Sequence, residues 1–432
     1  MTRRENHPHA AVTARYLTAG IPGIGGVLKE RPEDFLVDEV PLYTPSGEGE
    51  HLYLLVQKRE MSTLEMVSVI ARHFGVPTKA VGYAGLKDKH AITRQSVSVY
   101  LPGRSDADLA PLEHDRVAIA GAERHTNKLR PGHLRGNRFS IRVRGVEPTR
   151  VRDAHRALME LARIGAPNRV GLQRFGLLGN NHLIGRAIIL GDFDAAVREL
   201  LGPSESRPDF NREARDLFTQ GKFREAIQQY PMQAKAETRV LHQLSLGRPV
   251  RSAILSLDET TIRFWLTAFQ SAVFNAVLDE RIEAGTLAAL APGDVAIKHD
   301  NLAAFTVDDA TAAAAETPER LASFSISPSG PMWAASMLRA SGATAEREAA
   351  ALARFGVTTD ALDAFDRGFR YPLEGKRRPL RVPIIDPEVE GGVDEHGPYV
   401  RCAFELPRGA FATVVMDEIM KNAAASTADE GA

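Results

Sequence analysis

HLYLLVQKREMSTLEMVSVIARHFGVPTKAVGYAGLKDKHAITRQSVSVYL, residues 51–101, places a strand, a helix, a glycine-bearing loop and a second strand in succession. The run from His51 is short and apolar, as in a buried strand. Ser62 and Glu65 then form a capping box, which begins a helix predicted to reach about His73. The apolar helix positions are Leu64, Val67, Ala71 and Phe74, and the closing strand puts Val97, Val99 and Leu101 on one face.

Strand and helix patterns of the same kind flank this stretch. In VLKERPEDFLVDEVPL, Phe35 and Val37 share one face of a strand, opposite Asp34 and Asp38. Residues 139–144 form a further strand, and residues 150–164 an amphipathic helix. That strand turns Phe139, Ile141 and Val143 inward and Ser140, Arg142 and Arg144 outward. The order strand, strand, helix, strand, strand, helix predicts an α+β sheet with helices on one side.

A chain of 432 residues is long for one hydrophobic core, which predicts two domains or one domain with a large insertion. Long helical runs begin near 181, the segment ISPSGPM (326–332) is rich in turn residues, and basic strand-like sequence returns near 377. We predict a first domain over 1–180, an insertion over 181–376 and a return segment over 377–421. Flexibility is expected in part of the first 20 residues, and disorder in the tail 422–432.

Composition indicates a cytoplasmic globular protein. No stretch approaches the roughly 20 apolar residues that span a bilayer, and the N-terminal residues lack the apolar core of a signal peptide. The one cysteine, Cys402, lies in the alternating run YVRCAFEL and is predicted to be a strand residue. A single cysteine excludes an internal disulfide and a cysteine-rich zinc site, which fits a reducing compartment.

Positive charge is concentrated in the first part of the chain. Residues 1–180 carry 27 Lys and Arg against 19 Asp and Glu, a net charge of +8, although the whole chain has −1. Residues 124–144, RHTNKLRPGHLRGNRFSIRVR, hold seven Lys or Arg and no Asp or Glu. Basic residues along a loop and a strand face favour contacts to the phosphates of RNA or DNA. Phe139 in this basic segment either stacks on an extruded base or belongs to the strand core.

Asp88 is the candidate catalytic carboxylate, in the loop GYAGLKDKHAITRQ (82–95). Gly82 and Gly85 permit unusual backbone angles, so the loop can display Asp88 outside a helix. Nearby cations keep a carboxylate ionised, and an ionised aspartate acts as a nucleophile or an electrostatic stabiliser. The alternative is an aspartate whose side chain closes the turn. The potential cations next to it in sequence are Lys87, Lys89 and His90.

A glycine-rich run, APNRVGLQRFG (166–176), carries Asn168, Gln173 and Arg174. Amide and guanidinium groups of this kind can read base edges or phosphates, or can tie a loop to a neighbouring domain. Signatures of competing chemistries are missing from the sequence: it has no HExxH zinc motif, no Walker A sequence and no GxSxG elbow.

In this order the segments resemble the TruD family of pseudouridine synthases. The family's AGxKDxxAxTxQ reads AGLKDKHAITRQ here, which implies that Asp88 is catalytic. KxxPEDFxVxE is matched by KERPEDFLVDE, which implies that Lys29 is the basic partner of the carboxylate. GNxF is matched at 136–139, with Phe139 expected to stack on the target base. PNxxGxQRFG matches 167–176 and the family's closing segment resembles 406–419, with departures at Arg169, Val170, Ala410 and Asp417.

The resemblance implies a pseudouridine synthase-type mixed, largely antiparallel sheet with flanking helices, and an inserted α/β TRUD domain. It implies an isomerase that makes pseudouridine in tRNA, at conventional position 13 of the D arm, without a metal or an organic or nucleotide cofactor. We expect a monomer without a membrane partner. Substrate binding is assigned to Lys87, His90, Gln95, Arg130, Asn137, Phe139, Arg142, Gln173, Arg174 and Phe175.

Two alternatives to this function come from other classes. One is an RNA-binding protein of the same fold that aids tRNA folding without catalysis, and the other is a glycosylase that releases the base. Asp88 and Lys29 argue against the first, since a binding protein needs no ion pair of this kind. In the isomerase, the carboxylate either attacks the sugar carbon or removes a ribose proton, after the target base has left its stack.

Overall fold

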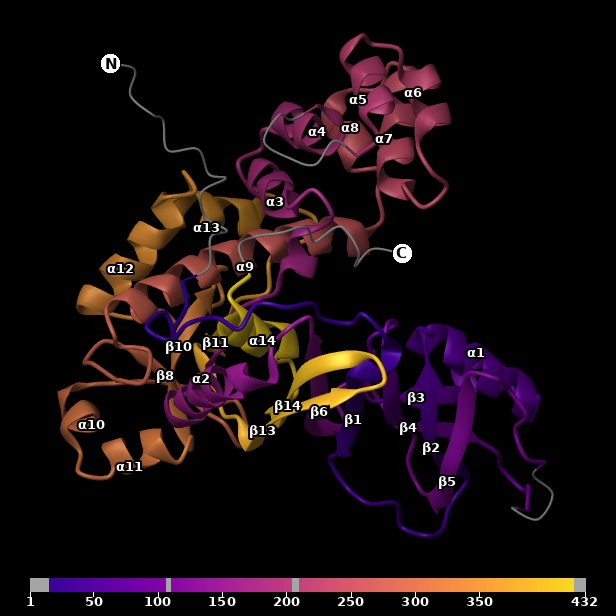
Figure 1. The fold of residues 1–432 in the computed structure, drawn as a ribbon. Helices are drawn as coiled ribbons and strands as arrows, with labels where there is room; N and C mark the ends of the chain where they lie inside the picture. The colour runs from indigo at the N-terminus through magenta and orange to yellow at the C-terminus, as the bar shows by residue number, and fades with distance from the viewer. Residues whose placement is uncertain (1–14, 106–109, 204–209, 423–432) are drawn as a thin grey trace. The chain divides into compact units, whose positions relative to one another are not determined.

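The computed structural model describes residues 15–105, 110–203 and 210–422, which divide into two compact units (Figure 1). The β-rich unit comprises residues 17–166 and 382–423, and the α-rich unit residues 167–381 with the residues before 17. The predicted insertion, 181–376, is contained in the α-rich unit. The expected flexible N-terminal segment up to residue 14 and the expected tail from residue 423 lie outside the described residues.

The β-rich unit is built on an eight-stranded sheet in the order β13-β14-β6-β1-β4-β2-β5, with β3 paired to β4. Only the β1–β4 pair is parallel among the pairs of this sheet that the structure describes, which confirms a mixed, largely antiparallel sheet. The strands are β1 (Phe35–Pro41), β2 (His51–Arg59), β3 (Val81–Tyr83), β4 (Ile92–Tyr100), β5 (Val117–His125), β6 (Leu134–Arg144), β13 (Ile385–Asp394) and β14 (Gly397–Pro407).

Three helices cover this sheet: α1 (Thr63–Phe74), α2 (Val151–Ile164) and α14 (Ala412–Met420). The predicted capping box of α1 is present, with Ser62 accepting a hydrogen bond from the Glu65 backbone and Glu65 accepting one from the Ser62 backbone. One apolar cluster joins α1 to β2, β3 and β4, and a second joins α2 and α14 to β1, β6 and β14. Packing of amphipathic helices on apolar strand faces therefore holds the unit together.

Both apolar clusters lie on one face of the sheet, as predicted. Val37 of β1 is paired with Thr93 of β4 and with Phe139 of β6, while Leu54 of β2 is paired with Val97 of β4. Thr93 and Val97 share a face because alternate residues of a strand point to the same side. The clusters are separated on that face by buried polar side chains, here called the polar patch: Glu39, Lys58, Thr93 and Gln95.

Three expectations for individual side chains in this unit are wrong. Asp34 and Arg144 do not face solvent, because they form a buried ion pair with each other. Leu64 is 56% exposed and does not belong to the apolar face of α1. Met66 and Ile70 are among the residues that form this buried face.

The α-rich unit is organised around the long helix α9 (Glu259–Glu283), which packs on the strand β10 (Ile326–Met332). The other helices of the unit are α3 (Asn181–Ile189), α4 (Phe193–Leu201), α5 (Arg212–Thr219), α6 (Phe223–Gln229), α7 (Lys235–Ser245), α8 (Val250–Ile254), α10 (Asp309–Ala313), α11 (Thr317–Ala322), α12 (Gly342–Ala353) and α13 (Thr359–Gly368). Of these, α3 and α12 pack on α9. A four-stranded sheet has the order β11 (Lys376–Pro379), β10, β8 (Val295–Lys298) and β9 (Ala304–Thr306), and the short β7 (Ala166–Pro167) and β12 (Arg381–Val382) pair with each other.

The turn-rich composition of ISPSGPM suggested turns, which is wrong. The segment forms the strand β10, and every residue of this strand is buried. Its polar groups are satisfied inside the unit, since Ser329 donates to the Val295 carbonyl and accepts from Arg377. Of the helices that the structure describes, none combines the length and the apolar composition that a bilayer crossing requires.

Gly82, just before the loop that carries Asp88, is required by close packing and not by an unusual backbone angle. Neither Gly82 nor Gly85 has a positive φ, so the predicted reason for these glycines is wrong. A Cβ atom on Gly82 would lie 2.3 Å from the Leu129 carbonyl oxygen and 2.6 Å from the Ser98 hydroxyl. The loop after β5 therefore approaches the strand β3 too closely for any side chain there.

Replacing Gly82 by Ala should destabilise the protein, because the backbone at Leu129 must move to admit a methyl group. We expect the free energy of unfolding in urea to fall by about 1–3 kcal/mol. Gly85→Ala is the matched control, since its Cβ would have its nearest neighbour at 3.4 Å, an ordinary contact. Equal stability of the two variants would contradict the packing argument.

Candidate active site

Asp88 lies on the loop between β3 and β4 and is held at both carboxylate oxygens. Its Oδ2 accepts a hydrogen bond from Lys29 Nζ at 2.6 Å, and its Oδ1 accepts one from the His90 backbone at 3.0 Å. The Asp88 side chain is 25% exposed and that of Lys29 is 10% exposed. The carboxylate is thus fixed in direction while one part of it faces solvent, as a reacting group requires.

Lys29 is held in a strained backbone conformation. Its φ is +55°, in the left-handed region that residues other than glycine rarely adopt. Its ammonium group also lies 4.8 Å from the centre of the Phe35 ring, a favourable cation–π contact. Strain of this kind persists only where surrounding contacts enforce it. The segment 27–34 must therefore be anchored firmly on both sides of Lys29.

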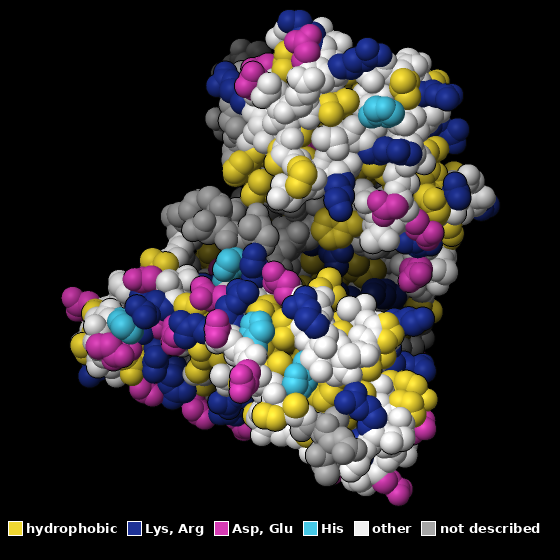
Figure 2. All heavy atoms as spheres, turned by 90° about the vertical axis from the view of Figure 1, so that its right-hand side faces the viewer, with side chains coloured by type: hydrophobic (Ala, Val, Ile, Leu, Met, Phe, Trp, Pro, Cys, Tyr) yellow, Lys and Arg dark blue, Asp and Glu magenta, His cyan; other side chains and the backbone are white. Residues whose placement is uncertain are grey.

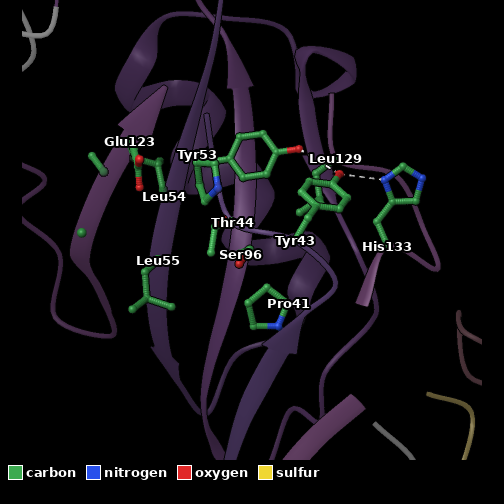
Figure 3. A pocket seen from close by; sticks show the side chains of 13 residues that line it. Pro41, Tyr43, Thr44, Tyr53, Leu54, Leu55, Ser96, Glu123, Leu129 and His133 are labelled. Carbon is green, nitrogen blue, oxygen red and sulfur yellow. Dashed lines mark hydrogen bonds between the residues drawn. The ribbon is translucent and has the colours of Figure 1, made fainter. Parts of the chain in front are cut away.

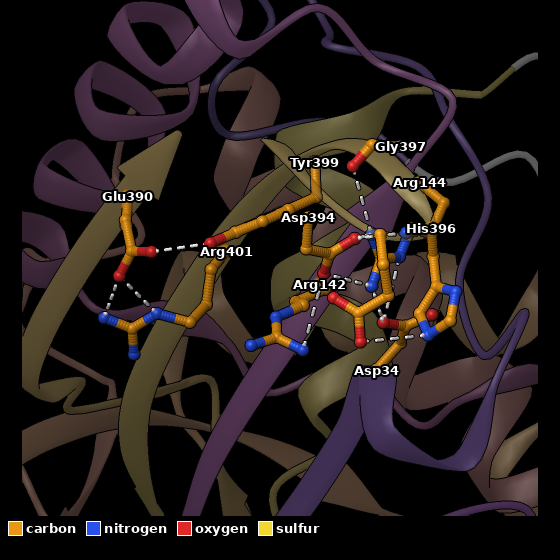
Figure 4. Close-up of polar contacts among 10 residues, drawn as sticks. Asp34, Arg142, Arg144, Glu390, Asp394, His396, Gly397, Tyr399 and Arg401 are labelled. Carbon is orange, nitrogen blue, oxygen red and sulfur yellow. Dashed lines mark hydrogen bonds and ion pairs between the residues drawn. The ribbon is translucent and has the colours of Figure 1, made fainter. Parts of the chain in front are cut away.

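Arg144 provides that anchor (Figure 4). Its backbone exchanges two hydrogen bonds with Val27, at 2.9 and 3.0 Å, and its guanidinium binds Asp34 at 2.6 Å. The same guanidinium binds both oxygens of Asp394 at 2.7 and 2.9 Å. Hydrogen bonding from Arg144 lowers the pKa of Asp394 to about 2. Arg144 thus ties the Lys29 segment to β6 and to the end of β13, and it was wrongly expected to face phosphates.

Glu39 and Lys58 of the polar patch bind residues of the Asp88 loop. Lys87 turns away from Asp88 and pairs with Glu39 at 2.5 Å, with both side chains almost fully buried. Glu39 also accepts from the Ser96 backbone, and Thr63 accepts from the Lys87 backbone. The two bonds of Lys87 tie the loop to β1 and to the start of α1, and the Ser96 bond ties β1 to β4.

Lys58 of the polar patch is the closest supporting group that sequence reasoning missed. Its side chain is 0% exposed, and its Nζ donates a hydrogen bond of 2.5 Å to the Asp88 carbonyl oxygen. Leu54, Val56 and Lys58 are alternate residues of β2 and therefore point to the same, inward side of the sheet. Strand alternation alone could thus have shown that a lysine points into the core. Glu39 and Thr63 were missed as well, because their partners are distant in sequence.

The predicted substrate-binding residues of the β-rich unit occupy different environments. His90 and Arg130 are exposed, whereas Gln95 is buried and bonded to Thr63. Phe139 is 8% exposed and packs between Phe35 and Phe404, with ring centres 6.4 and 5.8 Å away. Polar atoms buried without a hydrogen-bond partner in the described part of the chain include Asn137 Oδ1, Gln95 Nε2 and Thr93 Oγ1.

Much of the basic segment 124–144 is neutralised by carboxylates from elsewhere in the chain. The pairs are Arg135–Glu405, Arg138–Glu388, Arg142–Asp394 and Arg144–Asp34. Arg142 also lies over the Tyr399 ring, 5.0 Å from its centre. On the face drawn in Figure 2, basic and acidic side chains are accordingly interspersed. The absence of acidic residues within the segment therefore does not make it a continuous basic surface.

Gln173, Arg174 and Phe175 belong to the α-rich unit, in a short 3₁₀ helix (Leu172–Phe175). Phe175 is buried against the edge of the His182 ring. Arg174 lies over the Phe264 ring, and burial lowers the pKa of its guanidinium.

A cavity of about 310 Å³ in the β-rich unit is lined by residues that include Tyr43, Tyr53, Ser96 and His133 (Figure 3). Tyr53 and Ser96 reach it because they alternate with the inward residues of β2 and β4. Tyr43 bonds to His133 Nδ1 at 2.9 Å and lies 3.2 Å from the Tyr53 hydroxyl. This aromatic lining lacks a carboxylate paired with a cation, so the Asp88 loop is the stronger candidate for chemistry. In the described residues no cluster of three or more His, Cys, Asp or Glu could hold a metal ion.

The mixed sheet and the lysine-paired aspartate on the loop between β3 and β4 are the features expected of a pseudouridine synthase. The chain belongs to the TruD family: the family model described as tRNA pseudouridine synthase D matches residues 11–419. Relatives named tRNA pseudouridine synthase D include that of Geobacter metallireducens, 42% identical over 94% of this chain and 98% of its own length. That of Syntrophotalea carbinolica is 40% identical, over 94% of this chain and 99% of its own.

A solved structure gives the same result for the fold. The TruD protein of Methanosarcina mazei superposes with a TM-score of 0.82 at 26% sequence identity, covering 96% of this chain and 97% of that one. The α+β fold predicted from the order of elements and from the resemblance is confirmed.

Asp34→Asn should destabilise the β-rich unit and slow any reaction at Asp88, because the Lys29 segment loses its charged anchor. Breaking a buried ion pair costs about 3–5 kcal/mol, and the bond of Arg144 to Asp394 places the expected loss at the lower end. Asp38→Asn is the control: Asp38 is an exposed carboxylate on the adjoining strand β1, and its loss should change the free energy of unfolding by less than about 0.5 kcal/mol. Urea unfolding of both variants decides the matter, and similar losses would refute the anchor.

Proposed function

We propose that this chain isomerises uridine to pseudouridine in tRNA with Asp88 as the catalytic carboxylate and Lys29 as its ion-pair partner. The observation that carries the proposal is the 2.6 Å contact between these side chains on a partly open loop. The two residues come from different motifs, 59 positions apart, and both motifs match the family text. Asp88 also closes its turn through the bond from the His90 backbone, but turn closing by itself needs no strained lysine held against the carboxylate.

The chemistry requires little beyond a fixed carboxylate. The bond from ribose C1′ to uracil N1 breaks, the uracil turns in place, and a bond from C1′ to C5 forms. The hydrogen of C5 leaves as a proton and N1 gains one, so the reaction is an isomerisation without redox change. Asp88 begins it either by attacking C1′ or by removing a ribose proton. Because the uracil itself rejoins the sugar, no water must be activated, in contrast to glycoside hydrolysis.

A buried polar atom of β6, on a residue paired with Glu39 of β1, supports binding of an extruded base. Asn137 Oδ1 is buried without a partner among the described residues, and buried polar atoms are normally hydrogen-bonded. A uracil imide or an ordered water would satisfy it. The base must leave its stack before reaction, and the cost of a few kcal/mol is met by such contacts.

Several finer assignments belong to this proposal. The target is the uridine at position 13 of the D arm, by the specificity that the family name implies. Gln173, Arg174, Arg130 and Arg142 contact the tRNA, and the protein acts as a monomer in the cytoplasm. Mapping of pseudouridine in tRNA from cells with and without the gene, together with the mass of the purified protein in solution, tests these assignments.

Asp88→Asn should abolish product formation, because the amide cannot act as a nucleophile or a base. We expect the single-turnover rate constant to fall by at least about a thousandfold, as for other catalytic groups. The assay is release of the C5 hydrogen from tRNA labelled with tritium there, followed by nucleoside analysis. Asp115→Asn, at an exposed aspartate of the same unit, should react normally. Free uracil in the digest would indicate a glycosylase, and wild-type binding without product an inactive folding aid.

Phe139→Leu should slow the reaction more than it weakens tRNA binding. Phe139 contacts Phe35, over which Lys29 lies, so a smaller side chain loosens the support of the ion pair or of the stacked base. We expect a rate loss of about tenfold with a dissociation constant changed by less than about twofold. Phe404→Leu is the matched control, because Phe404 packs on the other side of Phe139. Equal losses in rate and affinity would contradict this role.

A further inference from the structure

Lys58 is completely buried, which is rare for a lysine. Its side chain is fully buried on β2, within the face of the sheet that holds the two apolar clusters. Burial of an ammonium group costs several kcal/mol unless partners compensate for it. The hydrogen bond of Nζ goes to a neutral oxygen, the Asp88 carbonyl, rather than to a carboxylate. The neighbouring Lys87 has its own partner, Glu39, so Lys58 does not serve that carboxylate.

The ammonium group of Lys58 binds the main chain of Asp88, while other groups bind the Asp88 carboxylate. The bond to the Asp88 carbonyl fixes the peptide that bears the carboxylate, at 2.5 Å. The two oxygens of the carboxylate are held separately, by Lys29 and by the His90 backbone. Lys58 thus holds the backbone of the residue whose side chain Lys29 holds. A charge in the low-dielectric interior also acts more strongly on its neighbours than one in water.

We infer that Lys58 is a positioning residue for Asp88, whose buried positive charge holds the carbonyl of residue 88 and stabilises the ionised carboxylate during the reaction. The inference rests on the proposed function, because it assigns a role within the same site. Lys58 touches no substrate, since its side chain is covered on all sides. It differs from Lys29 in acting through the main chain, and it lies outside the family motifs that the sequence matches.

The charge of Lys58 should be lost at mildly alkaline pH. Burial lowers the pKa of Lys58 to about 8, with the Lys87 charge acting in the same direction and the Asp88 and Glu65 charges opposing it. The protonated form therefore predominates below this pKa and the neutral form above it. The charged groups that act on Lys58 are Lys87 and Asp88 of the loop and Glu65 of α1.

Lys58→Met and Lys58→Arg separate the charge from the packing. Lys58→Met should lower the single-turnover rate constant on labelled tRNA by about tenfold to 100-fold, because a misplaced reacting group costs roughly that much. Its tRNA affinity should equal that of the wild type. Lys58→Arg keeps a charge that does not titrate and should restore part of the rate. Lys79→Met, at an exposed lysine of the same unit, is the control and should react normally.

The dependence of the rate constant on pH gives a readout that loss of packing would not move. Wild-type enzyme should lose activity as pH rises through about 8, whereas Lys58→Arg should keep its activity there and Lys58→Met should show no inflection. The uracil imide also ionises in alkali, but equally for every variant, so the ratio of wild type to variant isolates Lys58. Where Lys58→Arg fails to fold, judged by thermal melting, the profile of Lys58→Met against wild type carries the test.

Two outcomes would overturn the inference. One is a folded Lys58→Met protein that reacts at the wild-type rate, and the other is superimposable pH profiles for the wild type and the substituted protein. Either outcome leaves wild-type pseudouridine formation intact, and so leaves the proposed function standing. Failure of the proposed function is distinguishable, because the wild-type protein itself would then form no pseudouridine.

Discussion

The buried guanidinium of Arg144 is the contact on which the site depends. Arg144 joins two stretches far apart in the chain: its backbone binds Val27 and its guanidinium binds Asp34 in the segment 27–34, and the same guanidinium binds Asp394 at the end of β13. A bidentate arginine is suited to this because its fork of donors fixes direction as well as distance. Together with the bond to Asp88 and the contact with the Phe35 ring, this anchor holds Lys29 in a left-handed conformation.

Buried charge is used differently in the anchor and beneath the catalytic loop. Arg144 and its carboxylates form a compensated cluster, so the desolvation of each charge is offset by the other. Lys87 and Glu39 form a second compensated pair. Lys58 instead donates its hydrogen bond to the neutral carbonyl oxygen of Asp88, so this bond leaves the positive charge of Lys58 uncompensated close to Asp88. The polar patch therefore combines support of the loop with an electrostatic bias toward an ionised carboxylate.

Local patterns in the sequence were read correctly where local physics decides the structure. The capping box at Ser62 and the alternation of Val97 and Val99 each follow from neighbours within a few residues. ISPSGPM was misread because its turn-forming composition is overridden by burial against α9 and by bonds to Arg377. The outward assignment of Arg144 failed for a related reason, since alternation predicts which way a side chain points but not whether a distant carboxylate covers it.

The basic segment shows the same division between sequence and structure. Its run of cations without acidic residues is a true property of residues 124–144, and it suggested a phosphate-binding surface. Tertiary pairing with Glu388, Glu405 and Asp394 neutralises several of these cations. Local charge counts cannot contain such pairs, because their partners are about 250 residues away.

The sequence by itself determined the family, the candidate catalytic loop and the elements β1, β2, α1, β4, β6 and α2, because these depend on local period and on residue identity at short spacing; the strands β3 and β5 were not predicted. The tertiary structure alone decided which side chains surround Asp88. Lys29, Lys58 and the carbonyl of residue 88 meet only when β2 and the segment before β1 are brought to the same end of the sheet. These contacts depend on the register of the strands, which is a long-range property. No local pattern could therefore have placed Lys58 next to the Asp88 carbonyl.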